Sequence, residues 1–174
     1  VTLVGVLGAD SAMYSEDYRS FERSFSLLTQ VIGRAGRGDT PGLAIIQTSG
    51  NDNEMIELAE RQDYETFYSK EIMTRKLMVY PPYCDICVVT AQAIFEGRAK
   101  AAIEAVFNNI KELINGEFKG VKVIILGPSP SAVPKVNNRY RYRMMIKCKN
   151  TKEFRKMLRQ AVDIKTEAGT TVSV

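Results

Sequence analysis

The sequence predicts an α/β segment over residues 1–82, followed by an α+β domain over residues 83–174. Three observations support this fold class. Short β-branched runs alternate with stretches in which apolar residues recur three and four positions apart. The net charge changes sign at Pro82: the first part holds eight Lys and Arg against twelve Asp and Glu (net −4), and the second holds sixteen against eight (net +8). The second part also follows the order β-α-β-β-α-β.

The first segment is predicted to contain two strands and two helical stretches. The apolar runs predict strands at Thr2–Leu7 and Gly42–Thr48, and the periodic stretch Ser20–Ile32 predicts a helix between them. A second helical stretch covers residues 52–79 or so, with Asn51 or Asp52 as its N-cap. Because a single helix of this length is unusual in a globular domain, we expect a break near Arg61–Tyr64.

The second domain is predicted to contain four strands and two helices. The strands are expected at Cys84–Ala93, Val121–Leu126, Arg139–Cys148 and Thr171–Val174. The helices are expected at Glu96–Asn115 and directly after Thr151, whose hydroxyl suits an N-cap. A long loop, Gly127–Asn138, is expected to separate the second strand from the third because it holds three prolines. This order favours a ferredoxin-like α+β domain.

The composition excludes several classes of protein. No apolar run approaches the roughly 18 residues that a membrane-spanning helix needs. Three cysteines, an odd number, fit the reducing cytoplasm better than a disulfide framework. Cys84 and Cys87 have the spacing of zinc ligands, but the chain has neither a second pair nor a histidine. Residues three apart on a strand also point to opposite faces, so no metal site is predicted.

The run from Gln30 to Arg37 reads Q-x-x-G-R-x-G-R. It resembles the last motif of superfamily 2 helicases, where paired arginines face a nucleotide. Arg34 and Arg37 suit that role because guanidinium groups are always charged and present several donors. Gly33 and Gly36 would let the backbone approach a ligand closely. The alternative interpretation is a basic helix end with a left-handed glycine cap.

Residues 135–159 form the most basic part of the chain, with ten Lys and Arg against one acid, Glu153. Strand alternation places four cations on one face: Arg139, Arg141, Arg143 and Lys147. The other face carries tyrosines, including Tyr140, either as core residues or as platforms for bases. Like charges on one strand repel one another, so we interpret this face, with Lys135 in the preceding loop, as a binding surface for phosphates.

A wider set of motifs carries a more specific resemblance. They are Val4–Asp10, Asp17–Arg23, Pro81–Tyr83, Gly127–Pro130, Pro134–Lys135 and Arg139–Tyr142. In this order and spacing the chain resembles the C-terminal part of the primosomal protein N′ (PriA) family of replication-restart helicases, and it is expected to be a fragment of such a protein. It departs from the family at Gly8, where an acidic residue is usual.

The resemblance implies roles for the first segment. Residues 1–82 would be part of a RecA-like second helicase lobe, with Arg34 and Arg37 as arginine fingers and Gln30 positioning nucleotide or water. The residues Asp10, Asp17 and Arg19 would couple the nucleotide state to the grip on DNA. ATP and Mg²⁺ would act in the full-length protein, and zinc would bind a cysteine-rich module outside this chain. Neither G-x-x-x-x-G-K-[ST] nor D-E-x-H occurs, so we expect no ATPase activity from the fragment itself.

The resemblance also implies partners. They are forked and single-stranded DNA, other primosome proteins, and the acidic tail of single-stranded-DNA-binding protein, with Lys152 and Arg155 as candidate contacts for that tail. The protein is expected in the bacterial cytoplasm with the nucleoid and not at a membrane. An incomplete first sheet predicts self-association of the fragment. The alternative function is a non-enzymatic nucleic-acid-binding module with a ferredoxin-like fold.

Overall fold

The computed structural model describes residues 2–15, 17–35, 42–50 and 53–174. The chain forms two compact units, Val1–Leu77 and Met78–Val174. Each unit has its own hydrophobic core.

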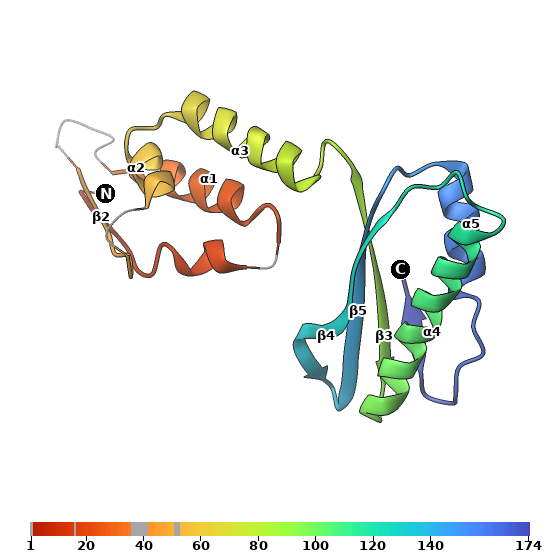
Figure 1. Cartoon of the computed structure of the whole chain (residues 1–174). Coiled ribbons are helices and arrows are strands. Elements are labelled where there is room, and N and C mark those ends of the chain that lie inside the picture. Colours follow the sequence, from red (N-terminus) through yellow and green to blue (C-terminus); the bar gives the residue numbers. More distant parts are fainter. Residues whose placement is uncertain (1, 16, 36–41, 51–52) are drawn as a thin grey trace. The chain divides into compact units, whose positions relative to one another are not determined.

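The first unit combines a small parallel sheet with helices (Figure 1). Strand β1 (Leu3–Val6) pairs in parallel with β2 (Leu43–Ile46), with Leu3 opposite Leu43. The helices are η1 (Ser11–Tyr14, 3-10), α1 (Ser20–Ile32), α2 (Glu54–Glu60) and α3 (Tyr64–Met78). The core gathers residues from η1 and all three α-helices, including Phe25, Leu28 and Phe67.

The predicted helix break is confirmed, because α2 ends at Glu60 and α3 begins at Tyr64. The predicted N-cap is wrong. Asn53 caps α2, and its side chain accepts a hydrogen bond from the backbone N–H of Met55. Residues 51–52 lie outside the described residues. The helix begins later than expected because the side chain of Asn53 supplies the same acceptor one residue further along.

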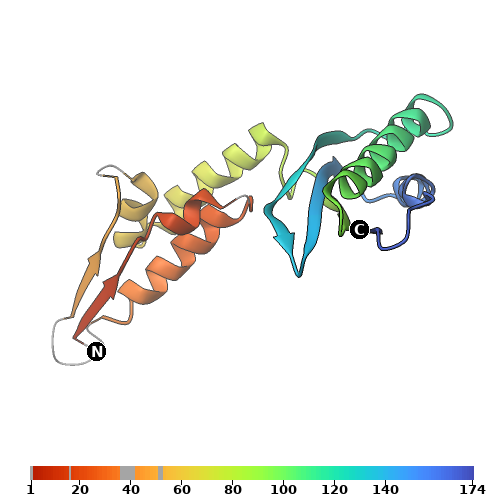
Figure 2. The same ribbon diagram turned by 90° about the horizontal axis from the view of Figure 1, so that it is seen from below.

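The second unit is a four-stranded antiparallel sheet with two helices (Figures 1 and 2). Its elements are β3 (Asp85–Ala93), α4 (Glu96–Asn115), β4 (Ile124–Val136), β5 (Arg139–Cys148), α5 (Lys152–Val162) and β6 (Thr171–Ser173). The strand order is β4-β5-β3-β6. Both helices cover the same face, where Val89, Met144 and Ile146 are buried against them. Within residues 78–174, all of which the structure describes, no helix covers the opposite face of the sheet.

The prediction of a long loop at Gly127–Asn138 is wrong. Most of it belongs to β4, which pairs with β5 from Ile124 to Val136. The pairing is interrupted between Leu126 and Ser129 and again between Pro130 and Lys135. The prolines are tolerated because β4 is an edge strand and because these interruptions relieve the need for a ladder N–H. Only Asn137 and Asn138 form the turn, both with positive φ, as a type I′ hairpin requires.

Candidate functional site

Asp10 lies just beyond β1, where its buried carboxylate joins the ends of the two parallel strands. It accepts hydrogen bonds from the backbone N–H of Ser49, at 3.0 Å, and from the Ser49 hydroxyl. These bonds, the hydroxyl's above all, hold the pKa of Asp10 below its ordinary value. Gly8 precedes it with φ +59°, a left-handed conformation that side chains rarely adopt. That geometry suits a glycine at position 8.

Asp17 and Arg19 lie in the loop before α1 and form a local network. Asp17 accepts the Arg19 backbone N–H at 2.9 Å and pairs with the Arg23 guanidinium at 2.8 Å. The Nε of Arg19 donates to the Tyr18 hydroxyl at 2.8 Å. Asp17 and Arg19 therefore bond within this loop and to the first turns of α1.

The motif residues Gln30, Gly33 and Arg34 lie at the opposite end of α1. This helix has 13 residues, so it separates them from Asp17 and Arg19 by about 20 Å. Gln30 and Arg34 are exposed. Gly33 has φ −66°, so it is not a left-handed cap; a Cβ there would lie 3.2 Å from the Thr29 carbonyl oxygen. The remaining motif residues, Gly36 and Arg37, lie outside the described residues.

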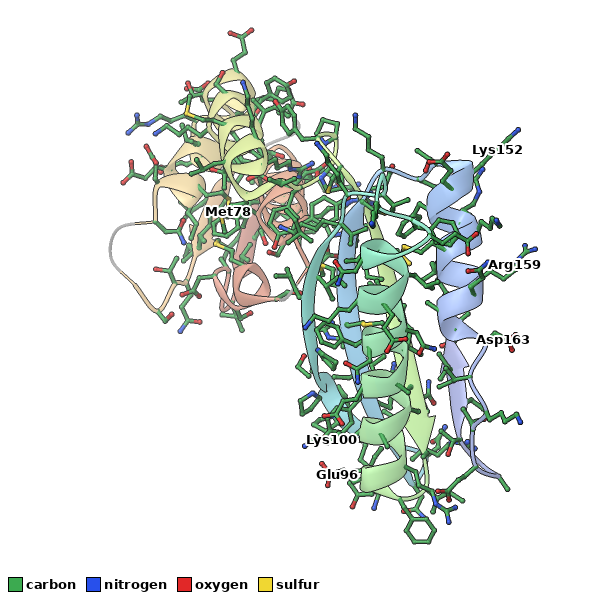
Figure 3. The ribbon with its side chains drawn as sticks, turned by 45° about the vertical axis from the view of Figure 1, so that its right-hand side comes forward. Met78, Glu96, Lys100, Lys152, Arg159 and Asp163 are labelled. Atoms are coloured by element: carbon green, nitrogen blue, oxygen red, sulfur yellow. The ribbon has the colours of Figure 1, made fainter. Side chains whose placement is uncertain are left out.

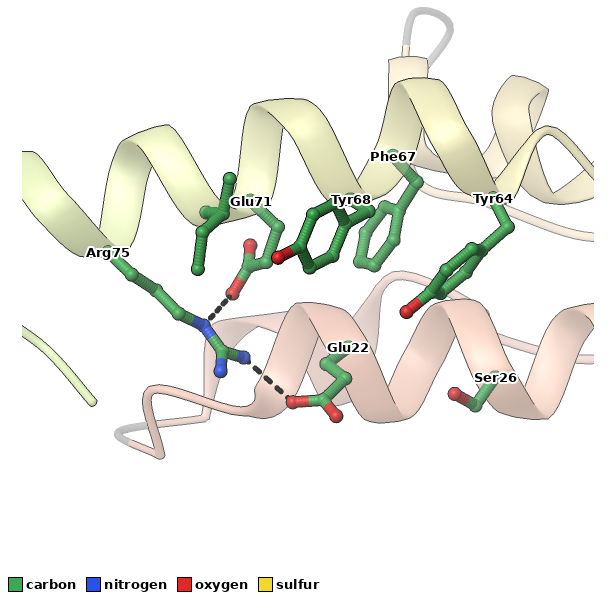
Figure 4. A pocket seen from close by; sticks show the side chains of 8 residues that line it. Glu22, Ser26, Tyr64, Phe67, Tyr68, Glu71 and Arg75 are labelled. Carbon is green, nitrogen blue, oxygen red and sulfur yellow. Dashed lines mark hydrogen bonds and ion pairs between the residues drawn. The ribbon is translucent and has the colours of Figure 1, made fainter. Parts of the chain in front are cut away.

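Arg75 is a residue that motif reasoning missed. Its Nε donates to Glu71 at 2.8 Å and its Nη2 to Glu22 on α1 at 2.7 Å (Figure 4). Its guanidinium carbon lies 5.3 Å from the centre of the Tyr18 ring. The guanidinium thus ties α3 to α1 and to the loop before it, beside a pocket of about 240 Å³ lined by Tyr64, Phe67 and Tyr68 among others. The Glu71–Arg75 spacing of four was the available sequence signal.

Three arginines of β5 share the face of the sheet that the helices leave uncovered. Their cross-strand neighbours on this face are uncharged: Thr90 lies opposite Arg143, Gln92 lies opposite Arg141, and Ser129 lies beside Arg143 on β4. Arg139 donates to the Gly169 carbonyl oxygen. The Nε of Arg141 is buried and has no hydrogen-bond partner among the described residues. This face therefore concentrates positive charge with no acid directly across the ladder.

Lys135, Tyr140 and Lys147 are placed differently. Lys135 lies directly opposite Tyr140, with its amino group 4.6 Å from the ring centre. Directly opposed residues share a face, so Lys135 lies on the Tyr140 side of the sheet and not with the arginines. Lys147 is on the arginine face but is only 7% exposed. Its amino group donates to the Met78 carbonyl oxygen at 2.6 Å and lies over the Tyr80 ring.

The outer side of α5 is also basic. Lys152 and Arg159 point away from α4 (Figure 3). Arg155 is held by Asn150, donating to its backbone oxygen at 3.1 Å and its side-chain oxygen at 2.9 Å. Thr151 caps the helix as predicted, accepting the Phe154 N–H at 3.1 Å. Lys152 and Arg155 are exposed neighbours on one helix, separate from the arginines of the sheet.

Within the described ranges, no three His, Cys, Asp or Glu side chains are grouped closely enough to hold a metal ion. Burial raises the pKa of Cys84 and of Cys87, and raises that of Cys148 to about 11, so these thiols are poorly prepared to become thiolate ligands. The residues present therefore do not fit a zinc site. Among the same residues, no helix is both long and apolar enough to span a bilayer.

Comparisons with known proteins agree with the sequence motifs. A family model described as the primosomal protein N C-terminal domain matches residues 76–174. A replication restart protein PriA from Bacillus subtilis (strain 168) is 42% identical over 163 residues, covering 94% of this chain and 20% of that protein. The proteins of the same name from Synechocystis sp. and Rickettsia conorii are 37% and 36% identical, each over 84% of this chain and over 17% and 21% of their own lengths.

The chain thus spans about a fifth of the length of the curated relatives it matches. The relatives align with residues of both units, because the Bacillus alignment covers more of the chain than the family model does. These matches confirm the resemblance that the motifs indicated. The chain belongs to the primosomal protein N C-terminal domain family.

Proposed function

We propose that this chain acts in replication restart as the C-terminal part of an ATP-dependent 3′→5′ DNA helicase that recognises stalled forks and assembles the primosome. The relatives' shared name, replication restart protein PriA, supports this role. In this proposal the first unit belongs to a RecA-like lobe. The parallel pairing of β1 with β2, which α1 separates along the chain, supports this assignment. The strand order β4-β5-β3-β6, with both helices on one face, supports a ferredoxin-like second unit.

In the full-length protein, Arg34 and Arg37 would reach the γ-phosphate of ATP bound with Mg²⁺, and Gln30 would position nucleotide or water. The exposed side chains of Gln30 and Arg34 at the end of α1 support this assignment. Arg37→Ala in the full-length protein should then lower ATP turnover by about 10³- to 10⁵-fold while leaving DNA binding nearly intact. Arg61→Ala is the control, because Arg61 is an exposed arginine of the same unit. ATP turnover by the 174-residue chain alone would contradict the proposal.

The second unit would bind DNA through the phosphate backbone. One observation carries this part of the proposal: Arg139, Arg141 and Arg143 share an uncovered sheet face on which their cross-strand neighbours are uncharged. A polyanion is the partner that removes the repulsion among them. The excess of sixteen Lys and Arg over eight Asp and Glu in residues 83–174 supports the same partner.

Fluorescence anisotropy of a labelled oligonucleotide, titrated with the chain at several salt concentrations, tests this. Affinity should depend little on base sequence and should fall steeply with salt. Arg139→Ala and Arg141→Ala should each flatten the slope of log K against log[salt] by about 0.7 on single strands. Lys100→Ala, on α4, should not. No binding at low salt, or arginine variants no weaker than Lys100→Ala, would refute the assignment.

Further partners follow from the same proposal. Lys152 and Arg155 would contact the acidic tail of single-stranded-DNA-binding protein, and other surfaces would contact primosome proteins near the nucleoid. The exposed apolar side chains Leu3, Leu43 and Ile45 on one face of the β1–β2 sheet support self-association of the isolated chain. Light scattering that shows a strict monomer would contradict the last point. The alternative function is a non-enzymatic nucleic-acid-binding module. It gives no role to the first unit, although the Bacillus subtilis relative aligns with residues of that unit as well.

A further inference from the structure

The second unit contains a cavity of about 630 Å³ at the end of the sheet remote from the Asn137–Asn138 turn. Its lining combines the half-exposed ring of Tyr83 with aliphatic side chains, among them Val121, Val123 and Ile124. Such a volume lies within the range of sites that bury a small organic group. All residues that line the cavity belong to the second unit.

The charges around the cavity are mostly positive. The side chains of Lys122 and Lys149 are exposed, and within the described part of the chain neither amino group makes a hydrogen bond, ion pair or ring contact. Lys147 also lines it, although its amino group is turned to Met78 and Tyr80. Glu153 is the one acid among the lining residues. The cavity therefore suits a ligand with a flat apolar body and an anionic group at its rim.

The cavity lies at the end of the sheet, and its lining reaches the arginine face at Lys147 and Ile124, whereas Val121, Val123 and Cys148 belong to the side that the helices cover. Alternation on β5 places Lys147 on the arginine face, and Ile124 lies opposite Lys147 on β4. Lys147 follows Arg143 by four positions, which is about 13 Å along the strand. The face between them carries the apolar side chains Val88 and Leu126, both partly exposed. A cationic end, an aliphatic middle and a lysine-rimmed cavity thus follow one another.

We propose that this cavity seats one unstacked nucleotide of a single DNA strand whose other phosphates lie on the arginine face. The inference rests on the DNA-binding function proposed above and specifies its substrate as single-stranded. A duplex keeps its bases paired and stacked, so it has no apolar group to place in the cavity. A base would pack against the Tyr83 ring, and Lys122 and Lys149 would hold its flanking phosphates.

An acidic peptide with an apolar end would also match the lysines. It would leave the arginine end of the sheet unoccupied. A nucleic-acid strand would contact both charged ends and the aliphatic surface between them, so the path from the arginines over Val88 and Leu126 to Lys147 and Ile124 favours it. The peptide is retained as an outcome of the test.

The test compares single-stranded and duplex DNA of about 12 nucleotides by anisotropy, using the full 174-residue chain. Tyr83→Ala should weaken single-strand binding by about five- to a hundredfold, and Tyr83→Phe should retain it. Lys122→Glu/Lys149→Glu should weaken single-strand binding more than the matched control Lys100→Glu/Lys165→Glu. The control makes the same change in net charge on α4 and in the segment between α5 and β6. Glu153→Gln should strengthen single-strand binding. The affinity for duplex DNA should fall by the same factor in the Lys122/Lys149 variant and in the Lys100/Lys165 control.

The outcomes separate this inference from the proposed function. If Arg139→Ala weakens binding but the Tyr83 and lysine variants match the control, the cavity proposal is wrong and the DNA surface stands. If the unaltered chain binds neither single-stranded nor duplex DNA, the proposed DNA-binding function itself is refuted. NMR shifts of cavity residues with an acidic peptide ending in phenylalanine, but none with oligothymidylate, would assign the cavity to a peptide and overturn the inference. An unchanged melting temperature of the second unit establishes that each variant is folded.

Discussion

Replacing Arg75 with methionine should loosen α3 from α1. The Arg75 and Glu71 side chains are 15% and 16% exposed, and Glu22 is half exposed. Methionine keeps most of the apolar stem but leaves Glu71 poorly solvated without its cation. Breaking a fully buried pair costs about 3–5 kcal/mol, whereas an exposed pair contributes about 0–1 kcal/mol. With one partner largely buried and one exposed, we expect a loss of about 2 kcal/mol, which is roughly a thirtyfold change in an opening equilibrium.

Hydrogen exchange of the α3 amides measures this loss, with the α4 amides of the other unit as an internal reference. The matched control is Arg61→Met, because Arg61 and Glu57 form another i,i+4 pair, 3.8 Å apart and largely exposed. It should cost about 0.3–0.5 kcal/mol. Arg75→Leu combined with Glu71→Leu should recover much of the loss, since no charge is then left buried. An Arg75→Met effect no larger than that of Arg61→Met would refute the electrostatic account of this contact.

Three further outcomes are expected. Burial raises the pKa of Cys148 from 9.0 to about 11, so its alkylation near pH 8 should be about a hundredfold slower than in denaturant. Equal alkylation rates in the folded and denatured protein would contradict this prediction. The stability that the neutral thiol contributes is complete below pH 9 and is lost as the pH rises towards 11. Asn53→Ala removes the cap of α2 and should lower the stability of the first unit by about 1 kcal/mol in urea unfolding, while a change under about 0.3 kcal/mol would argue against the cap. Ile146→Ala, at a fully buried position, should cost the second unit about 2–5 kcal/mol in the same assay, and a loss below 1 kcal/mol would mean that the sheet core is loosely packed.

Local patterns located most elements because they are set by nearby residues. The stripe of apolar residues in Glu96–Asn115 and in Ser20–Ile32 gave both ends of these helices correctly. The second strand of the basic domain was missed over Gly127–Val136, because prolines normally argue against a ladder. What permits them is the edge position of β4, and strand order is a property of the whole sheet.

The basic surface shows the same limit. Alternation placed Arg139, Arg141 and Arg143 on one face, which the register confirms. It also placed Lys147 there, but the burial of Lys147 depends on Met78 and Tyr80, about seventy residues earlier in the chain. Lys135 falls on the opposite face because of how many residues β4 inserts between Pro130 and Lys135, and composition does not reveal that number.

The Asn137–Asn138 turn has a consequence for the order in which the second unit folds. It joins β4 to β5 with two residues that already favour left-handed backbone, so this hairpin closes the shortest loop in the sheet. Hairpins of this kind form in about 1–10 μs, whereas pairing β3 with β5 must first close a loop of some fifty residues. We therefore expect the ribbon carrying the arginines to be the folding nucleus and the β3–β5 ladder to form afterwards. In a mutant series, changes at the turn should slow refolding, while changes on β3 should mainly speed unfolding.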